Sequence, residues 1–127
     1  MPADSGVPTQ VEGDVGTFAV VDGIAYAGSP AHDGVVIRLA SEALEACAPG
    51  QPAQALEVPA AAGTQRASLW ACDQETCRTT GHPVAEVTLD AVGNAVGERI
   101  VGRVEVVDAI GQSTGSADFD VVYCGIL

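Results

Sequence analysis

The sequence predicts an all-β domain, an antiparallel β-sandwich of the immunoglobulin-like or a similar type with seven or eight short strands. Short apolar segments alternate with turns rich in Gly, Pro and Asp, apolar residues recur mainly with the period of two that is typical of strands, and helical periodicity is almost absent. A small β-barrel is the alternative architecture. We favour the sandwich because a closed barrel usually needs longer strands.

Two parts of the chain differ in composition. Residues 1–16 contain several Gly, Pro and acidic residues with few apolar anchors, which is typical of an extended tether. Residues 17–127 carry the apolar periodicity and are expected to form a single β-sandwich domain. We expect little intrinsic order in the tether unless a neighbouring subunit binds it.

The first half of the domain contains three local signals. Asp22-Gly23 lies between two short apolar runs and predicts a hairpin turn. Residues 34–40 predict a buried strand. Residues 42–47 predict one short helical turn, with Ser41 as its N-cap.

The middle of the chain predicts an edge strand and a hairpin. Residues 53–58 alternate in polarity and have prolines on both sides, which favours a strand at the edge of a sheet. Residues 64–72 alternate well and place Trp70 on the outward face. We expect this segment to pair as a hairpin with residues 84–90, across the polar loop 73–83.

The C-terminal hairpin joins residues 98–107 to residues 115–123. When these segments are folded about the midpoint of their connection, large and small side chains oppose each other on the inner face, and opposite charges meet on the outer face. A slip of one residue would mix the apolar and polar faces. The predicted pairs are Gly102 with Phe119, Val104 with Ala117, Ile100 with Val121 and Arg103 with Asp118.

Composition limits the partners of the protein. The chain of 127 residues is 47% hydrophobic, and its 17 acidic residues outnumber 5 arginines, with no lysine, to give a formal net charge of −12 at pH 7. Such a charge repels nucleic acid and anionic membrane surfaces. Uninterrupted apolar runs are far shorter than the roughly 18 residues that a spanning helix needs. We therefore expect neither nucleic-acid binding nor direct membrane insertion.

The cysteines Cys47, Cys72, Cys77 and Cys124 favour disulfides formed in an oxidising compartment. A zinc site is disfavoured because only two of the four lie close together in sequence. Three pairings are possible and the sequence does not decide among them, although we prefer Cys72 with Cys77 and Cys47 with Cys124. The expected location is extracytoplasmic: secreted, periplasmic or lipid-anchored at the cell surface. Because residues 1–6 lack the pattern of a signal peptide, we expect an export segment to have been removed.

Four segments in the second half of the chain form a familiar pattern. They are residues 69–77 (LWACDQETC), 87–92 (VTLDAV), 101–106 (VGRVEV) and 115–120 (GSADFD), followed by Cys124. In the spacing of the predicted strands and the placement of the cysteines, residues 65–125 resemble uncharacterised exported domains of GC-rich bacteria, myxobacteria among them. Many of those domains look like lipoproteins. The resemblance implies an extracytoplasmic β-sandwich and supplies no catalytic residue. The pair Cys72 and Cys77 departs from the pattern.

Catalytic chemistry has little support in the sequence. The chain lacks G-x-S-x-G, H-E-x-x-H, Walker-loop and dinucleotide-binding motifs. His32 beside Asp33 could act as a proton-transfer pair, but an Asp before a Gly in a turn is the simpler interpretation. His82, which precedes a proline, is interpreted as a solvated loop residue. We therefore predict neither an enzyme nor a cofactor.

The outward faces of the strands carry two candidate binding features. Asp118 and Asp120, with Glu105 and Arg103 across the hairpin, could bind a cation such as Ca²⁺, but without a glycine-rich acidic loop a solvated face is favoured and no metal site is predicted. Trp70 is the candidate ligand-binding residue, because an exposed indole offers a large contact area at small entropic cost. The alternative is that Trp70 packs in a second core layer.

These observations favour a non-catalytic exported or surface-attached β-domain that acts in binding or assembly. One alternative is a small-ligand or carbohydrate-binding module that uses Trp70 and nearby loops. Another is a subunit of a surface filament, in which residues 1–16 add a strand to the sheet edge of a neighbour. The candidate partners are thus another protein, a second copy of the chain through its sheet edges, or a glycan.

Overall fold

Short strands account for most of the residues that the computed structural model describes, which are 10–16, 18–27, 34–44, 52–73, 76–93, 95–107, 110 and 113–125. The strands of this part of the chain are β1 (Gln10–Val15), β2 (Phe18–Val20), β3 (Asp22–Ala27), β4 (Val35–Ala40), β5 (Gln54–Pro59), β6 (Gly63–Arg66), β7 (Ser68–Cys72), β8 (Cys77–Gly81), β9 (Val84–Val92), β10 (Arg99–Val107) and β11 (Ser113–Val122).

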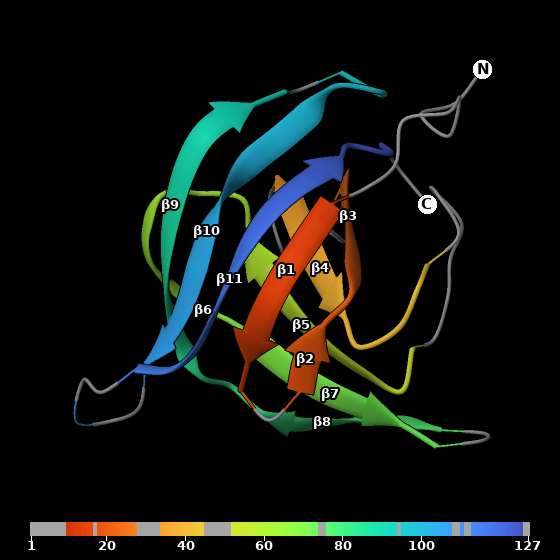
Figure 1. Cartoon of the computed structure of the whole chain (residues 1–127), viewed down its shortest axis with the longest axis vertical. Coiled ribbons are helices and arrows are strands. Elements are labelled where there is room, and N and C mark those ends of the chain that lie inside the picture. Colours follow the sequence, from red (N-terminus) through yellow and green to blue (C-terminus); the bar gives the residue numbers. More distant parts are fainter. Residues whose placement is uncertain are drawn as a thin grey trace.

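The strands form two antiparallel sheets that pack face to face (Figure 1). One sheet has six strands in the order β2-β1-β11-β10-β9-β6, and the other has five in the order β3-β4-β5-β7-β8. The predicted β-sandwich is confirmed, although it has eleven strands in the described residues and not seven or eight, and the alternative of a small barrel is wrong, since two separate sheets are present. Among the described residues, no helix has the length and hydrophobicity needed to cross a membrane.

The core lies between the two sheets and explains the alternation of apolar residues. Along β10 every second residue is buried from Ile100 to Val106, and those between them are partly or fully exposed. Removing these apolar side chains from water is the main force that holds the sheets together. Fully buried members of the core include Val15, Ala25, Ile37, Leu39, Leu56, Val58, Ala85, Ile100, Val104 and Val121.

The register of the C-terminal hairpin is confirmed for every predicted pair. The pairs in β10 and β11 are Gly102 with Phe119, Val104 with Ala117, Ile100 with Val121 and Arg103 with Asp118. On its other side, β10 pairs with β9 through a bulge beside Gly102. A Cβ atom at position 102 would lie 2.1 Å from the carbonyl oxygen of Thr88, so this close approach of two backbones requires glycine.

One predicted hairpin is wrong and a second is confirmed only in part, because the chain crosses between the sheets. Asp22-Gly23 is no turn, because it opens β3 of the five-stranded sheet, while β2 belongs to the six-stranded sheet. Residues 63–66 pair with β9 as expected. After the buried Ala67, however, the chain enters the other sheet, where β7 pairs with β5 and β8. The expected polar loop 73–83 therefore contains strand β8.

Three smaller expectations also need correction. Residues 10–15, assigned to the tether, form β1 between β11 and β2, because Val11 and Val15 are buried in the core; residues 1–9 lie outside the described residues. The predicted edge strand β5 is central, since its only proline stands at its end. Residues 41–44 are not helical, and the rest of the predicted helical turn lies outside the described residues.

Candidate functional site

The outer face of the five-stranded sheet carries a cluster of polar and aromatic side chains. Its members are Tyr26 on β3, Arg38 on β4, Glu57 on β5 and Trp70 on β7, and we call them the Arg38 cluster. Arg38 lies directly opposite Glu57 in the β4–β5 ladder. Because successive side chains of a strand alternate between faces, all four point away from the core residues beside them.

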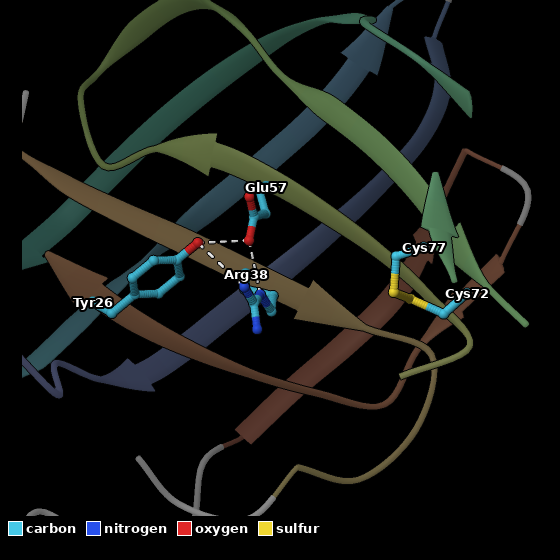
Figure 2. A network of polar contacts seen from close by, with 5 residues as sticks. All are labelled: Tyr26, Arg38, Glu57, Cys72 and Cys77. Carbon is cyan, nitrogen blue, oxygen red and sulfur yellow. Dashed lines mark hydrogen bonds and ion pairs between the residues drawn. A yellow bond between two sulfur atoms is a disulfide. The ribbon is translucent and has the colours of Figure 1, made fainter. Parts of the chain in front are cut away.

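Hydrogen bonds tie three of these side chains together (Figure 2). The Tyr26 hydroxyl donates to Glu57 Oε2 at 2.6 Å, and Arg38 Nε donates to the same oxygen at 2.8 Å. A second nitrogen of Arg38 lies 3.4 Å from the Tyr26 hydroxyl oxygen. The carboxylate therefore fixes both the phenol and the guanidinium, each of which comes from a different strand.

The guanidinium group of Arg38 also lies against two aromatic rings. Its Cζ atom is 5.1 Å from the ring centre of Tyr26 and 5.3 Å from that of Trp70. Both distances fall in the range of a cation–π interaction. Trp70 is thus on the outward face, as predicted, but it is half-buried and packs against Arg38. Ligand binding by Trp70 stays a prediction.

Partial burial gives the cluster its electrostatic character. The side chains of Arg38 and Glu57 are only 17% and 23% exposed. Burial, followed by the hydrogen bond to Glu57 and its charge, raises the pKa of Tyr26 to about 12. Tyr26 consequently stays protonated at neutral pH and acts as a hydrogen-bond donor to the carboxylate.

A small notch and a second polar pair adjoin the cluster. The notch has a volume of about 20 Å³ and is lined by Val36, Glu57, Val58, Pro59, Arg66 and Ser68. Ser68 lies opposite Glu57 in the β5–β7 ladder, and its Oγ is 3.4 Å from Nδ1 of His82. His82 is exposed, as predicted for a loop residue, and a polar row runs from Arg38 through Glu57 and Ser68 to His82.

A wider and more acidic hollow lies on the outer face of the other sheet. Its volume is about 660 Å³, and its acidic lining residues are Glu12, Asp90, Asp118 and Asp120. Asp118 pairs with Arg103 at 2.9 Å and Asp120 with Arg99 at 2.6 Å, both near the surface. Within the described part of the chain, no group of three or more His, Cys, Asp or Glu side chains is placed to hold a metal ion.

The remaining predicted site residues fall in three places. Cys72 and Cys77 form the predicted disulfide across the end of the β7–β8 hairpin (Figure 2). Cys124 is buried and disulfide-bonded, but its predicted partner Cys47 lies outside the described residues, so that pairing stays a prediction. His32 also lies outside the described residues.

Sequence reasoning missed Tyr26, Arg38 and Glu57. A signal for two of them was present, because Arg38 is the only charged residue in 35–40 and Glu57 the only one in 54–59. A lone charge in an otherwise apolar strand indicates an outward position and a partner on the next strand. The adjacency of β4 and β5 was needed to join them, and only the fold supplies it.

No protein-family model, curated protein or solved structure matches the chain. The class of protein that the geometry defines is a disulfide-bonded β-sandwich with a polar and aromatic cluster on one outer face.

Proposed function

We propose that this protein is a non-catalytic, extracytoplasmic binding domain whose binding surface is the outer face of the five-stranded sheet. The observation that carries the proposal is the Arg38 cluster, in which Glu57 holds a guanidinium group against Tyr26 and Trp70. Donors, acceptors and aromatic rings are thereby fixed in one orientation before a ligand arrives. Such preorganisation lowers the entropic cost of binding.

A purely structural role accounts less well for this cluster. A largely buried ion pair is often no more stabilising than apolar residues of the same volume, because both charges lose their hydration. On the opposite sheet, the pair Arg103–Asp118 avoids this cost, since its side chains are 51% and 70% exposed. The less exposed Arg38–Glu57 pair loses more hydration free energy on folding than the Arg103–Asp118 pair does. A binding role would explain why these two charged residues occupy this position.

The protonation states of the cluster favour binding over catalysis. Glu57 Oε2 already accepts two hydrogen bonds, from Tyr26 and Arg38. The pKa of Tyr26 is about 12, far from the neutral range in which a general acid or base is most effective. These groups are therefore suited to holding a ligand and poorly suited to moving protons.

Disulfide bonding supports the extracytoplasmic part of the proposal. Cys72 and Cys77 are bonded to each other, and Cys124 is also disulfide-bonded. Such bonds persist mainly in oxidising compartments. The filament alternative is less favoured, because residues 10–15 of the expected donor segment already pair with β11 and β2 of their own chain.

The proposal is tested by ligand screening with Trp70, the only tryptophan of the chain, as the fluorescent reporter. We expect a ligand that shifts the emission of Trp70 and binds weakly to the Glu57→Gln variant. Arg103→Gln, which breaks an ion pair on the opposite sheet, is the matched control and should bind normally. Ligands that bind both variants as tightly as the original protein would place the binding surface elsewhere and overturn the proposal.

A further inference from the structure

Resting on the function proposed above, we infer that the ligand of the Arg38 cluster is an uncharged carbohydrate. A sugar ring would lie against the exposed parts of the Tyr26 and Trp70 rings, and one of its hydroxyl groups would enter the notch beside Glu57. Charge, hydrogen-bonding capacity, aromatic surface and the size of the notch each favour this class of ligand.

The charge of the cluster favours a neutral ligand. Arg38 and Glu57 neutralise each other at 2.8 Å, and Tyr26 stays protonated, so the three side chains together have no net charge. An anion would in addition approach a protein whose formal net charge is −12. A cation would meet the guanidinium group of Arg38 at the centre of the cluster. Arg66, which also lines the notch, is exposed, so its charge is largely screened by solvent. Ions of either sign therefore gain little here.

The hydrogen-bonding groups of the cluster match hydroxyl groups. The face presents the guanidinium group of Arg38, an acceptor carboxylate, the oxygen of Tyr26, whose proton is already donated to Glu57, and at Ser68 a hydroxyl that can both donate and accept. A hydroxyl group donates one hydrogen bond and accepts others, so neighbouring hydroxyls of a sugar can use donors and acceptors that stand side by side. A ligand with acceptors only, or with donors only, could use only one of these two kinds of group.

The aromatic rings supply the apolar part of the contact. Tyr26 and Trp70 lie on either side of Arg38 in the sheet order, and both are half-buried with part of each side chain still exposed. The face of an aromatic ring carries partial negative charge and attracts groups of positive character. The C–H bonds on one face of a sugar ring have this character, whereas its edge carries the hydroxyl groups.

The notch beside Glu57 sets the size of the group that enters. Its volume of about 20 Å³ is enough for one group of the size of a water molecule. Within it, a sugar hydroxyl would meet the carboxylate of Glu57 and the hydroxyl of Ser68.

The experiment measures binding of neutral oligosaccharides to the full chain with its disulfides formed. The probes are hexasaccharides of the cellulose, xylan, starch and chitin types, with heparin and sialyllactose as anionic counterparts. Isothermal titration calorimetry gives the affinity, and Trp70 emission gives the location. We expect a neutral oligosaccharide to bind, and its affinity to fall at least about tenfold in Trp70→Ala and Glu57→Gln.

Control variants separate the possible outcomes. Arg103→Gln should bind like the original protein, and Trp70→Phe, which keeps an aromatic ring, should lose less affinity than Trp70→Ala and guards against misfolding of the latter. If no neutral sugar binds but another class of ligand requires Trp70 and Glu57, the carbohydrate inference fails and the proposed function stands. If no ligand that binds requires these residues, both fail.

Discussion

Replacing Gly102 by alanine tests the closest approach in the C-terminal part of the six-stranded sheet. The added Cβ would lie 2.1 Å from the carbonyl oxygen of Thr88, and 3.1 Å from both Leu89 Cα and Phe119 Cζ. Since Cβ atoms essentially never approach a heavy atom within 3.0 Å, the backbones of β9 and β10 must move apart by about 0.9 Å. Overpacking of this kind costs about 1–3 kcal/mol, and a weakened ladder hydrogen bond adds about 1 kcal/mol.

We therefore expect Gly102→Ala to lower the free energy of unfolding by at least about 2 kcal/mol, or about 8 °C in melting temperature. Urea unfolding followed by Trp70 fluorescence and circular dichroism measures the change. Gly81→Ala is the matched control: a Cβ there meets no atom within 4 Å, so stability should stay within about 0.5 kcal/mol. A Gly102→Ala variant as stable as this control, with an unchanged m-value, would refute the reasoning.

Three further predictions concern a covalent bond, a proton and the net charge. Because the cysteines of the hairpin disulfide are 5 residues apart, loop-closure entropy predicts that Cys72→Ser/Cys77→Ser loses about 2 kcal/mol in urea unfolding; an unchanged midpoint would contradict this. The pKa of Tyr26 is raised from 10.0 to about 12, so its contribution to stability is complete below pH 10 and is lost as the pH rises to 12. The urea midpoint should therefore decrease between pH 9 and pH 11 by less in Tyr26→Phe than in the original protein. An equal decrease in both proteins would count against the raised pKa of Tyr26. With a formal net charge of −12, the unfolding midpoint should rise between low-salt buffer and about 0.3 M NaCl, and a midpoint that falls would show that self-repulsion is unimportant.

Local pairing was predictable from the sequence where two strands follow each other closely. In β10 and β11, the apolar period of two and the match of Gly102 with Phe119 both select one register, and a slip of one residue destroys both. The class of fold followed from the same periodicity repeated along the chain. The Cys72–Cys77 bond is local in the same way, because the two cysteines are only 5 residues apart and closing a short loop costs little entropy.

Connections between distant strands were not predictable from the sequence. The alternation of apolar and polar residues continues without a break from residue 64 to residue 72, because the inward-facing Ala67 is equally suitable in either sheet. Nothing in this pattern marks the point where the chain passes from the six-stranded to the five-stranded sheet. The Arg38 cluster was missed for the same reason. Tyr26 and Glu57 are 31 residues apart, and Arg38 and Glu57 are 19 apart, so their contact depends on which strands become neighbours.

The pairing of β1 with β11 determines how the domain responds to mechanical force. In this antiparallel ladder Gln10 lies opposite Asp120, so the start of β1 and the end of β11 stand at the same end of the sheet. Beyond β11, the backbone of residues 123–125 bonds to β3. Cys124 lies in this segment and is disulfide-bonded, so a covalent bond holds the segment when tension is applied to the ends of the chain. The same tension loads the hydrogen bonds of the β1–β11 ladder one after another from the Gln10 end, because they lie perpendicular to the strands. A domain anchored at one end and pulled at the other would therefore release β1 at low force, and the disulfide at Cys124 would limit how far the rest of the chain extends.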